Sequence, residues 1–336
     1  MDNKVTRKSF NMQSLLAPAA LVILYAFFSI FGKNFFDIYT FKSILESSYY
    51  IGFLAFGVTF VIITGGIDLS IGTVMMCAAL IGGVAYTTWG WPLWLALCLI
   101  PVISIVFGTL NGFMIAKLKL PPFIATLGTM LVSQGFGSIV ANVRTQNFPT
   151  IGTTDGWFKT VFYRVGSFPI GMVYLVVAFI IAIFLLNKTR FGRYTFAIGS
   201  NEEAARLSGV DVDKWKILVY AVCGLFTGLA GIFYAGNYTT ILPGSGNGQE
   251  LNAIAAVVIG GTSMTGGSGT MIGTLIGVFI MSTLKSGLSS MGLQAHYQTF
   301  FTGFVVIGAV LLDKMRSNAA IAAKTKEVKA KEKAGS

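Results

Sequence analysis

Residues 69–116 read LSIGTVMMCAALIGGVAYTTWGWPLWLALCLIPVISIVFGTLNGFMIA, a run of 48 residues without Asp, Glu, Lys or Arg. A membrane-spanning helix needs about 20 apolar residues, so this run is long enough for two such helices. It is interrupted at 87–92 (TTWGWP), where Gly, Pro and Trp are typical of a turn at the membrane interface. The run therefore predicts two membrane spans joined by a short loop.

The rest of the chain has the same character. Of its 336 residues 54% are hydrophobic and 11% are charged, whereas a soluble domain carries about 25% charged residues. Seven further runs of at least 20 residues also lack charged side chains, which excludes a soluble protein and predicts an all-α polytopic membrane protein. These runs are 9–32, 47–67, 120–143, 165–187, 217–249, 251–284 and 286–312.

The runs predict about ten transmembrane helices. Run 251–284 divides at the glycine-rich stretch 266–269, and its halves, 251–264 and 270–284, are short enough to predict half-helices around a break. The two spans of 69–116 and these two halves account for four of the ten. The other expected spans are 14–31, 47–64, 125–140, 165–186, 217–236 and 297–312.

Basic residues set the expected orientation, because Lys and Arg concentrate in cytoplasmic segments. An N-in, C-in arrangement leaves 18 of the 24 Lys and Arg residues inside, so the net charge of +11 indicates topology rather than binding to nucleic acid. The expected divisions are a cytoplasmic N-terminus (1–13), a membrane domain (14–316) with a cytoplasmic loop at 188–216, and a cytoplasmic tail (317–336). The six basic residues outside are Lys33, Lys42, Arg144, Lys159, Arg164 and Lys285.

Two halves of five spans each would have opposite orientations, so spans 1–5 and 6–10 can form an inverted repeat. The similar segments 65–70 (GGIDLS) and 260–265 (GGTSMT) do not follow that symmetry, since both are expected at inward ends. The inverted repeat therefore stays one possible arrangement of the ten spans.

The sequence lacks the motifs of a catalytic subunit. It contains no phosphate-binding loop of the form G-x-x-x-x-G-K-[ST] and no His, Cys or carboxylate cluster with metal-ligand spacing. Cys77, Cys98 and Cys223 lie in apolar runs without paired spacing, which indicates packed thiols. We therefore expect a protein that is neither an ATPase nor a metalloenzyme.

Asp68 is the carboxylate that separates run 47–67 from run 69–116. An acid near the hydrocarbon is costly unless it finds donors, and it is often functional. One interpretation makes Asp68 the N-cap of the next helix, accepting from the amides of Ser70 and Ile71. The other places its carboxylate on the path of a solute.

Loop 188–216 predicts a short cytoplasmic helix at 201–209. Asn201 suits the N-cap, Glu202 and Glu203 suit the positive end of the helix, and Gly209 suits a left-handed stop. Ala204 and Ala205 are expected to admit close approach by another backbone. A two-turn helix is not stable by itself, so it indicates a docking surface, and the alternative is a solvated connector.

Five segments of the chain resemble the membrane subunit of bacterial ABC importers for monosaccharides, the ribose/galactose/xylose permease family. The resemblance extends over the second to the tenth expected span, and the ribose type is the most similar in its motifs. The chain departs from the family pattern at Asn252, where Asp is usual, and at Gln249, where Tyr is frequent. The segments are 65–72 (GGIDLSIG), 122–127 (PFIATL), 189–193 (TRFGR), 197–205 (AIGSNEEAA) and 250–263 (ELNAIAAVVIGGTS).

The resemblance implies a multi-pass permease of the bacterial cytoplasmic (inner) membrane that is not an enzyme and binds no cofactor. A second copy or a sister permease would complete a dimer, two ATPase subunits would use ATP and Mg inside, and an extracytoplasmic binding protein would deliver a ribose-like or related sugar. The short helix would then couple the permease to the ATPase. The coupling residues would be Gly199, Asn201, Glu202, Glu203, Ala204, Ala205, Arg206 and Gly209.

A neutral sugar needs hydrogen-bonding groups and exposed glycine backbone along its path rather than fixed charge. The candidate residues for this path are Thr64, Gly65, Gly66, Asp68, Ser70, Phe123, Thr126 and Asn252.

Two other functions compete with this one. An ion-coupled secondary transporter could use Asp68 as its coupling carboxylate, although the scarcity of other intramembrane acids argues against it. An ABC permease for another small solute, such as an amino acid, would share the same architecture. Genes for an ATPase and a binding protein beside this one would exclude the first alternative, and the ligand of the binding protein would decide the second.

The expected orientation can be tested with single cysteines on a cysteine-free background. Asp155→Cys should react with an impermeant thiol reagent in intact cells, and Thr325→Cys should react only after the membrane is permeabilised. Labelling of both positions from the same side would contradict the predicted number of spans.

Overall fold

A computed structural model describes residues 16–294, 296–308, 310–311 and 314–315, which are mostly helical. Within these residues six helices are long and apolar enough to cross a membrane, which agrees with the expected polytopic membrane fold. They are α2 (Ile38–Ile63), α4 (Leu93–Ala116), α5 (Pro122–Val140), α7 (Gly171–Lys188), α10 (Val212–Tyr238) and α12 (Met271–Ser290).

Shorter elements complete the described fold. Residues 296–308 are also helical, and β1 (Gln146–Asn147) pairs antiparallel with β2 (Thr240–Ile241). The apolar helices are α1 (Leu16–Phe31), α3 (Ile71–Thr87) and α11 (Gln249–Ile259), and the remaining ones are α6 (Trp157–Phe162), α8 (Arg190–Ser200) and α9 (Glu202–Leu207).

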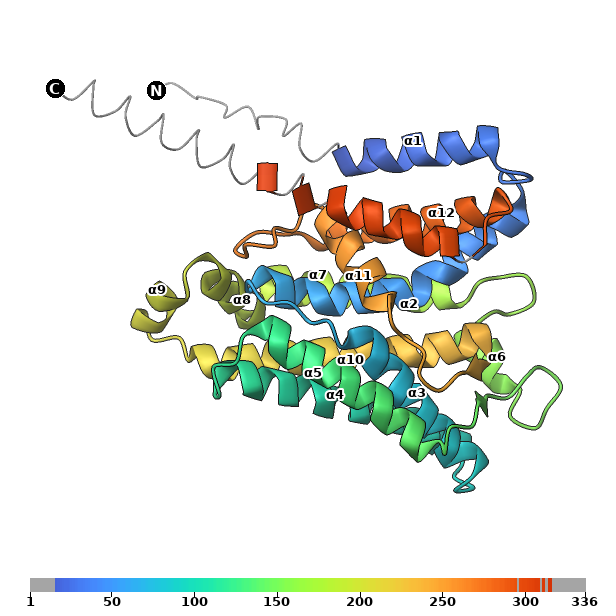
Figure 1. Cartoon of the computed structure of the whole chain (residues 1–336), viewed down its shortest axis with the longest axis horizontal. Coiled ribbons are helices and arrows are strands. Elements are labelled where there is room, and N and C mark those ends of the chain that lie inside the picture. Colours follow the sequence, from blue (N-terminus) through green and yellow to red (C-terminus); the bar gives the residue numbers. More distant parts are fainter. Residues whose placement is uncertain (1–15, 295, 309, 312–313, 316–336) are drawn as a thin grey trace, which may run out of the picture.

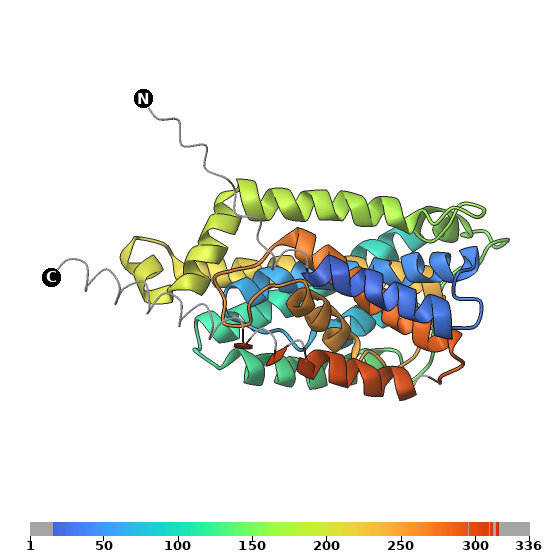
Figure 2. The same ribbon diagram turned by 90° about the horizontal axis from the view of Figure 1, so that it is seen from above.

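The long helices lie side by side along the longest axis of the molecule (Figure 1). α2 is fully buried from Ser47 to its end at Ile63, because it packs against α7, α10, α11 and α12. α8 and α9 lie at one end of the bundle and α6 at the opposite end, as Figure 2 also shows. α4, α5 and α7 expose many large apolar side chains, which suits a surface that faces lipid.

Glycines let α4 and α10 approach closely. A Cβ added to Gly108 would overlap the Tyr220 carbonyl oxygen, and one added to Gly224 would overlap the Ser104 carbonyl oxygen. Between helices in lipid the hydrophobic driving force is missing, and small residues at such crossings allow the close van der Waals packing that stabilises the contact instead. The helix contact at Gly224 and Gly228 is the kind that their spacing in the sequence predicts.

Among the expected spans whose bounds the structure corrects are the ones that correspond to α2 and α12. α2 begins at Ile38 rather than at 47, so Lys42 and Glu46 lie within the helix. α12 continues to Ser290 and includes Lys285, so it is a full-length helix and not a half. Both predicted spans stopped next to a charged residue, Glu46 in one case and Lys285 in the other. The structure accommodates these charges because the Tyr163 hydroxyl donates to Glu46 at 3.0 Å and the Lys285 ammonium donates to two tyrosine hydroxyls.

The close packing of α4 on α10 can be tested at a helical glycine. Gly108→Ala should lower the melting temperature of the purified protein, since the overlap with the α10 backbone costs about 1–3 kcal/mol. Gly135→Ala on α5 is the matched control, because its Cβ would meet no atom within 4 Å. It should be neutral or stabilising by up to about 1 kcal/mol. Equal melting temperatures for the two variants would contradict the close crossing.

Candidate functional site

The loop between α7 and α10 folds into two helices, α8 and α9. Asn201 separates them and caps α9, because its side-chain oxygen accepts from the Ala204 amide at 2.9 Å. Gly209 follows α9 with φ +81°, a left-handed conformation that suits glycine. The expected short helix is therefore present at Glu202–Leu207. The expectation did not include α8, an 11-residue helix whose Thr189 N-cap accepts from the Gly192 amide.

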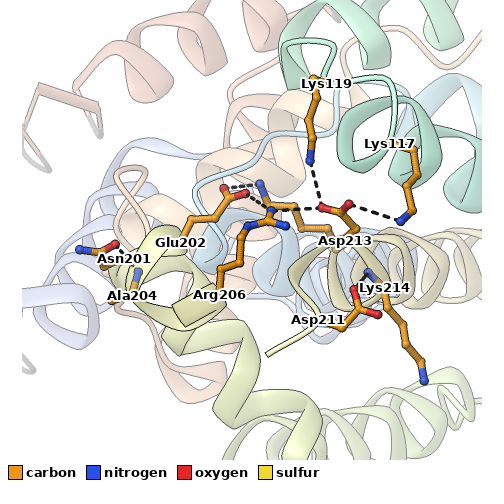
Figure 3. A network of polar contacts seen from close by, with 10 residues as sticks. Lys117, Lys119, Asn201, Glu202, Ala204, Arg206, Asp211, Asp213 and Lys214 are labelled. Atoms are coloured by element: carbon orange, nitrogen blue, oxygen red, sulfur yellow. Dashed lines mark hydrogen bonds and ion pairs between the residues drawn. The ribbon is translucent and has the colours of Figure 1, made fainter. Parts of the chain in front are cut away.

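Asp213, in the first turn of α10, holds α9 in place through a network of ion pairs (Figure 3). Its carboxylate contacts Lys117 Nζ at 3.4 Å, Lys119 Nζ at 3.0 Å and Arg206 Nη2 at 3.3 Å. One exposed ion pair contributes little to stability, but this group joins three segments: α9, α10 and the connection between α4 and α5. The sequence analysis missed Asp213 and both lysines as members of the site, because these residues come together only in the tertiary structure.

Glu202 forms the second part of this network. Its carboxylate lies 2.5 Å from Lys216 Nζ and 3.5 Å from Arg206 Nη2. Burial raises the pKa of Glu202, but the hydrogen bond from Lys216 and the positive charges of Lys216, Arg206 and Lys119 outweigh it, so the pKa lies below its ordinary value. Glu202 is thus ionised at neutral pH and fastens the start of α9 to α10.

The structure separates the two alanines of α9. Ala204 is exposed, but Ala205 is buried against Ile198 of α8 and Val212 of α10. The expectation that both alanines offer a contact surface is therefore wrong for Ala205, whose side chain holds α9 to its neighbours. The prominent apolar side chain at the end of α9 is Leu207, which is 88% exposed.

Gly199 connects α8 with the interior of the bundle. A Cβ at Gly199 would overlap the Ile63 carbonyl oxygen at the end of α2. The same carbonyl accepts from the Gly267 amide at 2.9 Å, in the loop between α11 and α12. The end of α8 thus touches the chain breaks after α2 and after α11, and no side chain fits between them.

Asp68 lies in the break between α2 and α3 and is 2% exposed. Its Oδ1 accepts from the Ser70 amide at 2.9 Å, from the Ser70 hydroxyl at 2.6 Å and from Asn111 Nδ2 at 3.5 Å. The N-cap of α3 is Ser70, which corrects the expectation that Asp68 takes this position. The carboxylate instead braces the turn that leads into the helix and ties it to α4.

This network extends to α5. The Thr129 hydroxyl donates to Asn111 Oδ1 at 2.5 Å, and Thr126 lies one helical turn earlier. Neither Asn111 nor Thr129 was among the residues expected from the sequence, because each is an ordinary polar residue in an apolar run. The tertiary structure identifies them as members of the site, because both are buried in the hydrogen-bond network that includes Asp68.

The structure divides the remaining candidate residues of the path among three places. Thr64 ends α2, Gly65 makes a turn with φ +77° and Gly66 lies beside the Tyr220 hydroxyl, so these three accompany Asp68 and Ser70. Phe123 is on the exposed surface of α5. Asn252 lies apart, on the wall of a cavity of about 460 Å³ that α11 and α12 share with residues 298–303.

Within the described residues, no group of three or more His, Cys, Asp and Glu side chains is placed to hold a metal ion. The polar groups of the site are mostly neutral amides and hydroxyls bonded to one another. Such an arrangement can position helices and contact a solute through hydrogen bonds.

A helical membrane bundle with broken helices, a buried polar network and a capped helical loop at one end has the features of a membrane permease. Residues 40–310 match the family described as branched-chain amino acid transport system / permease component. The chain belongs to this family of ABC importer permeases, which are multi-pass membrane proteins of bacteria and not themselves catalytic.

The chain is similar over nearly its whole length to named import permeases. It is 41% identical over 318 residues to the ribose import permease protein of Bacillus subtilis, covering 91% of this chain and 94% of that protein. The identity to the ribose import permease protein of Escherichia coli (strain K12) is 38% over 301 residues, or 88% and 92% of the two chains. The fructose import permease protein of Rhizobium meliloti is 34% identical over 309 residues, or 89% and 86%. No solved structure matches the chain.

The role of Asp68 can be tested by two substitutions. Asp68→Asn should keep much of the transport activity, because the amide oxygen can accept the same bonds from Ser70. Asp68→Leu should reduce expression or lower stability by about 1–3 kcal/mol, since it leaves buried donors unpaired. The measurements are monodispersity, melting temperature and uptake. If both variants fold normally and both are inactive, the negative charge itself is used, and the bracing interpretation is wrong.

Proposed function

We propose that this chain is the membrane-spanning subunit of an ATP-driven importer and passes a monosaccharide that an extracytoplasmic binding protein delivers. Separate ATPase subunits supply the energy. The observation that carries the proposal is the 34–41% identity, over nearly the full chain, to permeases named for ribose, fructose and galactose import. A second permease, either another copy or a sister chain, completes the assembly.

We further propose ten crossings with both termini in the cytoplasm. The order of α1 to α5, α7, α10, α11, α12 and the helix that begins at 296 is compatible with ten alternating crossings. The basic side chains of Lys117, Lys119 and loop 188–216 then share the inner side. The inverted repeat of two five-span halves stays a prediction, as do the divisions at 1–13 and 317–336, which lie outside the described residues.

In this proposal α9 is the coupling helix. Its exposed surface carries Glu203, Ala204 and Leu207, while Glu202 and Arg206 fasten it to the bundle. A groove in the ATPase would receive this surface. Because Gly199 contacts the Ile63 carbonyl without an intervening side chain, a displacement of α8 and α9 would act directly on the breaks after α2 and α11. These breaks are where a solute path can open or close.

An amino acid is the second candidate solute, because the description of the matching family names branched-chain amino acids. The permeases with the similarities described above are named for sugars, which favours the first candidate. Screening ligands of the cognate binding protein separates the two. An ion-coupled secondary transporter is disfavoured, since Asp68 is buried among neutral donors that hold it in a turn.

The coupling role can be tested at Leu207. Leu207→Arg should reduce association with the ATPase by roughly tenfold or more, because a charge would be buried where an apolar side chain docks. It should leave the permease monodisperse, since the side chain is 88% exposed. Ile151→Arg, at an exposed isoleucine outside this loop, is the matched control.

The measurements are co-purification with the ATPase and hydrolysis of ATP stimulated by the loaded binding protein. Glu203→Arg should act in the same direction as Leu207→Arg. Wild-type assembly and hydrolysis in both variants would show that α9 is a solvated connector.

A further inference from the structure

Lys285 is a charged residue on α12, a helix that is otherwise apolar enough to span the membrane. Its ammonium donates to the hydroxyl of Tyr50 at 2.7 Å and to that of Tyr238 at 3.0 Å. It also lies 5.3 and 5.6 Å from the centroids of these two rings. No carboxylate in the described part of the chain forms an ion pair with it. A cation in such a position is costly and is retained mainly for function.

The hydrogen bonds to the two tyrosines leave one N–H donor of the Lys285 ammonium available for another partner. An ammonium group has three N–H donors, and the two tyrosine hydroxyls accept two of them. Lys285 also lines the cavity of about 460 Å³ that contains Asn252. The structure therefore places a charged donor beside a space large enough for a small molecule, within the range of about 300–1,000 Å³ typical of such sites.

The walls of this cavity combine amide groups with an apolar surface. Asn252 Nδ2 donates to Gln249 Oε1 at 3.3 Å, which leaves the Asn252 oxygen and the Gln249 NH₂ group for another partner. This pair offers an acceptor and a donor side by side, as two neighbouring hydroxyl groups of a solute require. The apolar part of the wall includes Ile51, Leu284 and Leu288. The polar residues of the wall include Asn247, Gln249, Asn252, Lys285, Gln298 and Thr302.

A second cavity of about 190 Å³ adjoins the first, because Lys285 and Gln298 line both. Glu46 lines the smaller one, and the Tyr163 hydroxyl donates to its carboxylate. One positive and one negative side chain thus border the same region, and their charges balance. Amides, hydroxyls and balanced charge match a neutral molecule with many hydroxyl groups rather than an anion.

We propose that the cavity between α2, α11, α12 and residues 298–303 is a solute-binding site of the permease itself, which takes a neutral monosaccharide. The ammonium of Lys285 donates to a sugar hydroxyl, and the side chains of Gln249, Asn252 and Gln298 bind neighbouring hydroxyls. Tyr50 and Tyr238 hold Lys285 in position. This inference rests on the proposed function and assigns the solute a specific place within it.

Uptake into proteoliposomes tests the site, with the permease, its ATPase and the loaded binding protein reconstituted together. Lys285→Met and Gln298→Leu should each lower sugar uptake roughly tenfold, the effect expected when hydrogen bonds of a charged or buried group are lost. ATP hydrolysis stimulated by the loaded binding protein should continue, because neither residue lies near α9. Lys33→Met, an exposed lysine in the loop after α1, is the matched control and should transport normally.

A second measurement separates solute contact from a structural role of Lys285. Thr302→Cys, at a wall residue of the cavity that is not assigned to bind the sugar, should react with a small thiol reagent on a cysteine-free background. Millimolar ribose, galactose or fructose should slow the reaction. Leucine should not. Adding Lys285→Met should abolish the protection while the protein stays monodisperse, and Lys285→Arg should restore it in part.

The outcomes distinguish this inference from the proposed function. Protection by leucine and not by sugars, or no protection by any solute, would overturn the sugar site even if the wild-type importer transports sugar. Normal uptake by both Lys285→Met and Gln298→Leu would overturn it as well. If the wild-type complex imports no sugar that its binding protein carries, the proposed function itself is wrong.

Discussion

The fold depends on one constraint: in lipid, each backbone N–H and C=O group must find a partner within the protein. Helices satisfy this requirement internally, so the places where helices stop inside the bundle need special contacts. After α2, the Ile63 carbonyl accepts from the Gly267 amide, and the Ile67 carbonyl accepts from the Tyr220 hydroxyl. In the loop after α11, the Ser263 amide donates to the Ser268 carbonyl. The loop after α11 thus supplies a hydrogen-bond donor to the break after α2, and Gly199 of α8 packs against the same Ile63 carbonyl.

Charged side chains inside the bundle follow the same rule. Glu46 accepts from the Tyr163 hydroxyl, Asp68 accepts from Ser70 and Asn111, and Lys285 donates to two tyrosines. Neutral hydroxyl and amide groups stabilise each of these charges. Ion pairs instead gather at the end of the bundle, where Asp213 and Glu202 hold α9. Among the described residues, charges inside the bundle are thus stabilised by neutral groups, whereas charges at the α8–α9 end are stabilised by opposite charges.

In the α8–α9 unit, contacts with neighbouring segments hold the short helix α9 in place. A six-residue helix has little stability of its own, yet α9 is capped by Asn201, packed through Ala205 and fastened through Arg206. These contacts use one side of the helix and leave Leu207 and Glu203 exposed. A docking partner would therefore meet a surface that needs no rearrangement, and motion of that surface would pass through Gly199 to the ends of α2 and α11.

The amino-acid sequence by itself determined the features that depend on neighbouring residues. The long apolar runs specified a helical membrane protein, and Asn201 and Gly209 specified the bounds of α9 within one or two residues. The family was also readable, because segments such as 65–72 and 197–205 are distinctive.

Only the tertiary structure decided the features that depend on distant partners. It extended α2 across Glu46 and α12 across Lys285, because tyrosines far away in the sequence form hydrogen bonds with these charged side chains. It buried Ala205 while exposing Ala204, and it placed Asn252 in a cavity apart from Asp68. The reason is physical: helix formation and capping follow local spacing, whereas the environment of a polar group is set by whichever helices pack around it.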